Sequence, residues 1–304
     1  PSTYTQAKPE DVYKFIEEDL LYAVDNLPYA KDDASRSDNR FRLSKGAAMG
    51  LLAKVYATWA GQPVNDESKW EKAAQIAGEL INSGKHQLLS DYEQLWKNTC
   101  NGVWDANESL IEVSFYAPAI TGSSLLDPCG RIGKWNGVKT TMLAGERGSC
   151  AGNVKVIHPF VLKWREKDLT DGEVYNPETV KDKRLNLSVA NYQYSPNKVL
   201  YAKGKSDTDK KALENDADSK LKNKEKQNYT PAKWDIEKYV KNKLINNDKS
   251  NVNWYFLRYA DVLLLYAEAL NEWKQGPTKE AYDAINKVRE RAYGNNKYNL
   301  KNLS

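Results

Sequence analysis

The stretch Asn253-Trp-Tyr-Phe-Leu-Arg-Tyr-Ala-Asp-Val-Leu-Leu-Leu-Tyr-Ala-Glu-Ala-Leu-Asn-Glu272 decides the fold of this chain. Its large apolar side chains recur at helical spacing, and most of the residues between them are also apolar. A helix with this pattern is buried on nearly all sides. Gly276 and Pro277 follow it, which is a common way for such a helix to end. The stretch therefore predicts a buried helix close to the end of the sequence.

A second helix is predicted directly after the first. Thr278 is a suitable N-cap, and Gly294 is a suitable stop. The apolar face between them consists of Ala281, Ile285, Val288 and Ala292. Because the connection is short, the two helices are expected to form an antiparallel helical hairpin.

Three more helices are predicted in the first hundred residues. One spans residues 11–27, with an apolar stripe that consists of Val12, Phe15, Ile16, Leu20, Ala23, Val24 and Leu27. The next begins at the N-cap Ser44 and runs to about residue 60. The third covers about 68–82 and stops at Gly84. The short connections favour stacked helix pairs of the tetratricopeptide kind, although the sequence shows no repeat of about 34 residues.

Four of these segments together resemble the SusD/RagB family. The segment 253–272 is similar to the family's C-terminal signature, and Ile285–Ala292 fits its closing helix. Arg40–Tyr56, with its Ser-Lys-Gly-Ala-Ala opening, is similar to an earlier helix of the family. Val12–Pro28 resembles the helix that precedes it. The four occur in the family's order, so they are specific as a set.

The resemblance implies both a fold and a function. Members of the family are outer-membrane lipoproteins of the Bacteroidetes that bind glycans for a partner importer. The implied fold is mainly α, with tetratricopeptide-like helix pairs and an irregular insert that contains short strands. The implied partner is a SusC-like TonB-dependent transporter, and the implied membrane attachment is an N-terminal lipid. Family members are longer at the front, so the chain is expected to be a C-terminal portion of the full protein.

The expected organisation is one domain over residues 1–304. A helical scaffold is expected over about 10–100 and 250–295, and a loop-rich insert over about 101–249. Within the insert, apolar and polar residues alternate over 109–116, which predicts a short strand.

The rest of the insert is rich in glycine and then in lysine. Residues 117–153 contain seven glycines, and long loops inside a compact domain are usually functional or disordered. Residues 186–194 alternate like a strand. Residues 203–249 hold 13 lysines, nine acidic residues and few large apolar side chains, which favours an exposed, solvated segment.

Composition excludes several classes of function. The net charge of +4 arises from 45 basic and 41 acidic side chains, so a nucleic-acid surface is not expected. No run of about 18 apolar residues could cross a bilayer, and membrane contact is expected only through the lipid anchor. The chain has nine Trp and 19 Tyr against five Phe. These rings suit cores and half-wet surfaces alike, and they offer flat platforms for the C–H face of a sugar.

The three cysteines, Cys100, Cys129 and Cys150, are too few for a disulfide scaffold. Cys129 and Cys150 flank one glycine-rich loop, which a disulfide between them would close. Three reduced thiols are the alternative, and the sequence leaves both open.

Signatures of catalysis are sparse in this sequence. His86 follows a helix stop and is expected to be a surface or capping residue, and His158 is expected to be structural. Phosphate-loop, dinucleotide, nucleophile-elbow and zinc motifs are absent from the sequence, so no cofactor and no metal are expected. A pair of carboxylates for glycoside hydrolysis would leave no motif, so a hydrolase stays an alternative.

The candidate site lies in and beside the glycine-rich loop. Five residues there carry stacking rings or hydrogen-bonding groups suited to sugar hydroxyls: Trp104, Tyr116, Arg131, Trp135 and Asn136. Gly130, Gly133 and Gly137 would let the backbone approach a ligand. The alternative is a surface loop whose Trp135 packs into the core. These positions follow from residue chemistry, since no glycan-binding motif of the family matches here.

The sequence therefore predicts a non-enzymatic protein that binds a polysaccharide or oligosaccharide at the cell surface for an importer. The first alternative is a helical-repeat scaffold that binds protein or peptide, and the second is a glycoside hydrolase. Exposed rings within 117–153 would favour sugar binding, whereas buried rings would favour the scaffold.

Overall fold

The structure, a computed structural model, describes residues 5–37, 41–115, 130–140, 150–157, 159–161, 163–164, 180–195, 198–201, 229–240 and 250–301. The chain separates into two compact units that alternate along the sequence. The first, called here the helical unit, consists of Pro1–Ser90, Trp104–Val113 and Tyr255–Ser304. The second, called the insert unit, consists of Asp91–Val103 and Ser114–Trp254.

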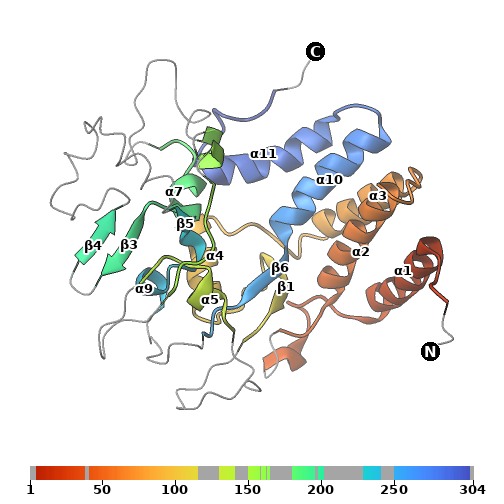
Figure 1. The fold of residues 1–304 in the computed structure, drawn as a ribbon. Coiled ribbons are helices and arrows are strands. Elements are labelled where there is room, and N and C mark those ends of the chain that lie inside the picture. Colours follow the sequence, from red (N-terminus) through yellow and green to blue (C-terminus); the bar gives the residue numbers. More distant parts are fainter. Residues whose placement is uncertain are drawn as a thin grey trace. The chain divides into compact units, whose positions relative to one another are not determined.

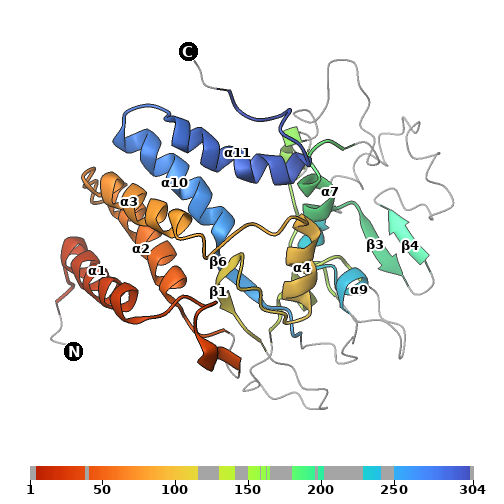
Figure 2. The same cartoon turned by 180° about the vertical axis from the view of Figure 1, so that it is seen from behind.

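The helical unit is built from α1 (Pro9–Asn26), α2 (Lys45–Ala60), α3 (Lys69–Asn82), α10 (Tyr259–Trp273) and α11 (Lys279–Tyr293), with a short 3-10 helix, η1 (Ala34–Ser37). In Figures 1 and 2 the five α-helices stand in a row in this order, and each packs on the next. The pairs α2–α3 and α10–α11 are helical hairpins with short connections. The predicted mainly α fold with tetratricopeptide-like helix pairs is confirmed.

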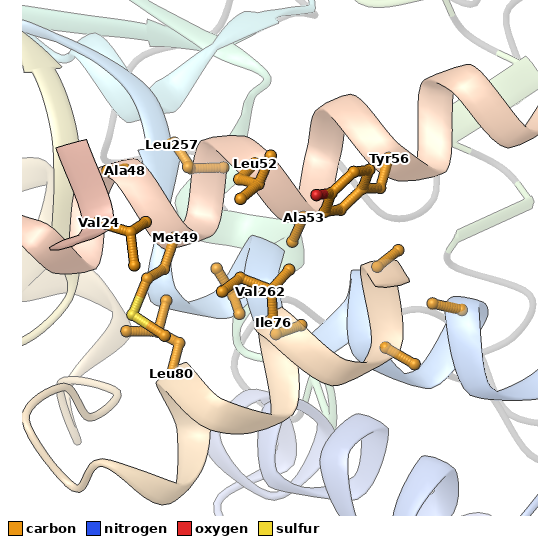
Figure 3. Packing of buried hydrophobic residues seen from close by; sticks show 14 of the residues in the cluster. Val24, Ala48, Met49, Leu52, Ala53, Tyr56, Ile76, Leu80, Leu257 and Val262 are labelled. Atoms are coloured by element: carbon orange, nitrogen blue, oxygen red, sulfur yellow. The ribbon is translucent and has the colours of Figure 1, made fainter. Parts of the chain in front are cut away.

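The core of the helical unit lies where α2, α3 and α10 meet (Figure 3). Leu52 of α2, Leu80 of α3 and Val262 of α10 are fully buried there. A methyl group added at Gly50 would lie 3.0 Å from the side chains of Leu110 and Leu257. Glycine at this position therefore lets side chains from outside the helix row reach α2.

Local signals set the ends of the helices as predicted. The Ser44 hydroxyl accepts a hydrogen bond from the Ala47 amide and begins α2, and Thr278 does the same for α11. Gly294 ends α11 in the left-handed conformation, with φ 72°, which glycine adopts without steric cost.

The segment 254–258 is a strand and not the start of a helix, so the prediction is wrong at this end. Strand β6 (Trp254–Arg258) pairs with β1 (Ser109–Val113) in a two-stranded sheet. Helix α10 begins only at Tyr259, whose amide donates to the Glu108 carbonyl. The Arg258 amide donates to the Asp261 carboxylate, which closes the first turn.

The apolar stripe predicted for α1 is only partly buried. Val24 is buried and Leu20 packs against the core, but Val12 and Phe15 are 46% and 65% exposed. The Tyr13 ring stacks on Trp59 of α2, with centroids 5.1 Å apart and planes 10° from parallel. This contact turns the face that carries Val12 and Phe15 towards solvent.

A buried ionic cluster joins distant parts of the helical unit. Glu108 is fully buried, and its carboxylate contacts the guanidinium groups of Arg291 and Arg258. The same carboxylate accepts from the Leu89 amide at 2.8 Å. The charge therefore has several donors, as burial of a carboxylate requires.

His86 is buried, with 4% of its surface exposed, so the prediction of a surface or capping histidine is wrong. Its Nδ1 lies 3.2 Å from the Asn107 carbonyl oxygen. Because a carbonyl only accepts, Nδ1 carries the proton and Nε2 does not. Nε2 is buried without a hydrogen-bond partner among the described residues and lies against Gly46.

The insert unit contains short elements only, among its described residues. They include α4 (Tyr92–Cys100), α5 (Ile132–Trp135), α7 (Arg184–Ser188), β2 (Val189–Ala190), β3 (Tyr192–Ser195), β4 (Lys198–Tyr201), β5 (Thr230–Pro231), η4 (Ala232–Trp234) and α9 (Ile236–Tyr239). Strand β2 pairs with β5, and β3 pairs antiparallel with β4 in the register Tyr192↔Tyr201. The predicted strand over 186–194 is therefore a helical turn followed by two short strands.

The prediction that 203–249 is exposed is wrong for residues 229–240. Tyr229 and Asp235 are fully buried, and Tyr239 is 5% exposed. The remaining parts of this segment lie outside the described residues, and so do Cys129 and His158. Within the described part of the chain, no helix is both long and apolar enough to span a membrane.

Candidate functional site

Three of the five predicted site residues lie on one short helix of the insert unit. Arg131 precedes α5 and is exposed, Trp135 is its last residue, and Asn136 follows it and is half-buried. The Trp135 amide donates to the Arg131 carbonyl at 2.9 Å, so these two side chains are one helical turn apart. Trp135 as a whole residue keeps 37% of its surface exposed.

The other two predicted residues are not placed beside α5. Tyr116 lies outside the described residues. Trp104 belongs to the helical unit, where it is half-buried. The described site therefore consists of Arg131, Trp135 and Asn136.

The three glycines around α5 pack against the protein itself. A methyl group at Gly130 would lie 2.8 Å from the Phe115 ring, and one at Gly133 would lie 2.6 Å from Val252. At Gly137 the added atom would lie 2.1 Å from the Trp234 carbonyl oxygen, which no side chain tolerates. The sequence predicts that these glycines let a ligand approach the backbone. In the structure they instead make room for neighbouring backbone and side chains of the protein.

A buried carboxylate holds the segment beside α5 in place. Asp235 accepts hydrogen bonds from the Tyr192 and Tyr194 hydroxyls at 2.8 and 2.9 Å. It also accepts from the Lys238 amide and so caps α9. Burial raises the pKa of Asp235, and these hydrogen bonds oppose that rise. Because the described donors all belong to the protein, Asp235 stabilises the segment 229–240.

Three tryptophans form a ladder in the insert unit that sequence reasoning missed. Trp96 of α4 is buried and meets Trp234 edge to face, with centroids 6.5 Å apart. Trp234 then stacks on Trp254, with centroids 5.4 Å apart and planes 17° from parallel. The Lys233 ammonium lies 4.6 Å from the Trp96 ring centroid, within range of a cation–π contact. Trp254, at the outer end, is 39% exposed.

The residue before Trp254 is held firmly by α4. The Asn253 amide donates to the Thr99 carbonyl at 2.9 Å, and the Thr99 hydroxyl donates to the Asn253 carbonyl at 2.8 Å. The Asn253 side-chain oxygen accepts from the Phe115 amide at 2.9 Å. Asn253 is fully buried, and hydrogen bonds hold both its backbone amide and its backbone carbonyl. The backbone directly before Trp254 is therefore fixed.

No local pattern in the sequence joins the three tryptophans of the ladder. Trp254 stands among apolar residues that were read as one helix, and Trp234 stands in the lysine-rich stretch. The alternation of exposed Trp254 and Phe256 with Tyr255 and Leu257 has the period of a strand.

The described residues present little metal chemistry. Within the described ranges no group of three or more His, Cys, Asp or Glu side chains is arranged to hold a metal ion. Cys100 is buried, and burial raises the pKa of its thiol, which keeps it protonated and unreactive.

Comparison with known proteins gives consistent matches. The model of the SusD family matches residues 119–302. A SusD-like protein of Bacteroides ovatus is 26% identical over an alignment of 316 residues, which covers 96% of this chain and 46% of that protein. The crystal structure of a SusD homolog from Bacteroides thetaiotaomicron is 64% identical, with a TM-score of 0.89 over all of this chain and 55% of that one.

A laminarin-binding SusD-like protein shares the fold, with a TM-score of 0.61 at 22% identity over 94% of this chain and 55% of that chain. This chain thus spans about half the length of the relatives it matches. The family model covers more than half of the chain. The chain therefore belongs to the SusD family.

Proposed function

We propose that this protein binds a polysaccharide or oligosaccharide at the cell surface and passes it to a SusC-like TonB-dependent transporter. The full protein would be held in the outer membrane by an N-terminal lipid. Membership of the SusD family supports this proposal, and so does the name of the laminarin-binding relative. We place the sugar contact on α5.

The exposure of Trp135 is the observation that carries the sugar site. Exposed aromatic rings in this unit favour sugar binding, whereas buried rings favour a protein-binding scaffold. Trp135 is 37% exposed at the end of a short helix in a loop-rich unit. Its indole offers a flat apolar face to the C–H groups of a sugar.

Two polar side chains complete this site. Arg131, one turn before Trp135, has five N–H donors for sugar hydroxyls, and Asn136 has both donors and an acceptor. A few such contacts, each of moderate strength, suit a protein that must release its ligand to a transporter. We propose no catalytic step, because the site offers binding groups only.

A glycan array followed by calorimetry tests the proposal. The wild-type protein should bind one class of glycan, and Trp135→Ala should weaken that binding about tenfold, which corresponds to about 1.4 kcal/mol. Tyr22→Ala is the matched control, because Tyr22 is a 71% exposed aromatic residue of α1 in the helical unit. It should leave the affinity unchanged.

Two results would contradict the proposal in different ways. Unchanged affinity in a folded Trp135→Ala protein would move the sugar site away from α5. Failure of the wild-type protein to bind any glycan would favour the protein-binding scaffold. Delivery is tested separately, by asking whether the full-length protein co-purifies with a TonB-dependent transporter from native outer membranes.

A further inference from the structure

We infer that Trp254, stacked on Trp234, is a second sugar platform in the insert unit, and that one oligosaccharide lies on both Trp254 and Trp135. This inference rests on the proposed function and adds a binding residue and a minimum ligand size to it. Four features of the described residues support it, namely exposure, stacking, a rigid backbone and proximity to α5.

The exposed surface of Trp254 has a defined shape. One face of its indole is covered by Trp234, with the two planes 17° from parallel. The residue as a whole keeps 39% of its surface exposed, and we infer that the sugar contacts the indole face opposite Trp234. A flat apolar face with a polar N–H at its edge matches a sugar ring, which has C–H groups on its face and hydroxyls around its rim.

The platform is rigid before any ligand arrives. Trp234 is braced by the buried Trp96, and Asn253 is tied to Thr99 by two hydrogen bonds. A side chain that is already held in place loses little conformational entropy when it binds. Solvent-exposed tryptophans without such bracing lose more, so the ladder favours binding at Trp254.

The two exposed indoles belong to one packed group of segments within the insert unit. Gly133 of α5 lies against Val252, two residues before Trp254, and Gly137 lies against the Trp234 carbonyl. Chain geometry then limits the distance between the α-carbons of Trp135 and Trp254 to roughly 22 Å. An oligosaccharide of several sugars can reach across any separation up to this limit.

The test uses the strongest-binding soluble polysaccharide from the array and its oligosaccharides of increasing length, starting from the monosaccharide. Trp254→Ala should weaken binding of the long oligosaccharides about tenfold, and it should leave monosaccharide binding at Trp135 unchanged. Trp254→Tyr keeps a flat ring and should restore most of the affinity. Trp254→Leu keeps apolar contact with Trp234 without a flat ring, so it covers the case in which the alanine variant does not fold.

Phe256→Ala is the matched control on the same strand. Phe256 is 49% exposed and has the Lys54 ammonium 5.2 Å from its ring centroid, but it is not part of the tryptophan ladder. Its loss should leave every affinity in the series within twofold of wild type. Circular dichroism spectra and the Tm of each variant check that the fold is kept.

The outcomes separate this inference from the proposed function. If Trp135→Ala weakens binding while folded Trp254→Ala and Trp254→Leu do not, the second platform is wrong and the proposed function stands. A loss at Trp254 that already appears with the monosaccharide would overturn the idea of one ligand on two platforms. If the wild-type protein binds no glycan, both are overturned.

Discussion

Leu263 and Leu264 are neighbours on α10 with opposite environments, and they make a matched pair for a stability test. Leu263 is fully buried and packs with Tyr259, Ala284 and Val288, whereas Leu264 is 42% exposed. Leu263→Ala should lower the free energy of unfolding by about 2–5 kcal/mol, because it removes apolar contacts and leaves a cavity. Leu264→Ala should change it by less than about 0.5 kcal/mol.

Urea denaturation of the two variants measures the difference. A loss below about 0.5 kcal/mol for Leu263→Ala would mean that α10 is not packed against α11 as described.

Glu108 should be the ionisable residue of the helical unit that is most sensitive to substitution. It is fully buried between Arg291 and Arg258. Glu108→Gln keeps the shape but removes the buried negative charge that contacts Arg291 and Arg258, which should cost about 3–5 kcal/mol. Asp283→Asn is the control, because it removes an exposed pair with Lys279. Its urea midpoint should not move, and a midpoint shift equal to that of Glu108→Gln would contradict this reasoning.

His86 gives the helical unit a predictable response to acid. Burial lowers the pKa of its imidazole below the ordinary value of 6.5. A second proton would place an N–H at Nε2, where no described residue accepts it. As pH falls through 6.5, the unfolded state takes up a proton that the folded state resists. The contribution of neutral His86 to stability is therefore present above 6.5 and lost as pH falls below it.

Denaturation at about pH 7.5 and about pH 5.5 measures this contribution. The wild-type protein should lose more stability between the two pH values than His86→Gln, which cannot be protonated. Equal losses in both proteins would show that other groups cause the acid sensitivity.

At the scale of elements, two serines that precede helices provide a comparison of capping. The Ser44 side chain caps the amide of Ala47 in α2, whereas Ser68, before α3, makes no cap hydrogen bond. Ser44→Ala should therefore cost about 1 kcal/mol, and Ser68→Ala should cost less than half as much. Thermal unfolding of both variants tests this, and an equal drop in Tm would argue against the cap at Ser44.

Residues 254–258 form a strand where the local pattern predicts a helix, so tertiary pairing overrides the local pattern there. Most of these residues are apolar and continue directly into the helix α10. The sequence pattern therefore predicts one helix over both segments. Strand β6 forms because β1 offers it a partner, and the Tyr259 amide is already bound by the Glu108 carbonyl. Pairing with a distant segment leaves no mark in the local helical period.

At the scale of the whole molecule, the protein is predicted to bind glycans without cleaving them. The buried Asp235 carboxylate is occupied by Tyr192 and Tyr194 of the same unit, so it is not offered to a substrate. Incubation with plant, host and storage glycans should release no new reducing ends. Steady release from any one of them would favour the hydrolase alternative.

Features that depend only on neighbouring residues could be predicted from local sequence. Ser44, Thr278 and Gly294 mark helix ends because a cap bonds an amide within the same turn. The buried stripe of α10, with Leu263 and Leu270, follows from the helical period alone. The set of segments that resembles the SusD family lies in these helices.

The faces that those elements bury, and the distant residues that meet, depend on contacts between segments far apart in the chain. Phe15 is exposed because Tyr13 stacks on Trp59 from another helix. The glycine-rich setting of Trp135 predicts it as a site residue, but the Trp234–Trp254 stack joins two segments whose local patterns predict a helix and an exposed loop. Burial and stacking depend on pairs of residues that the fold brings together. A local sequence pattern cannot show such a pair when its two members lie far apart in the chain.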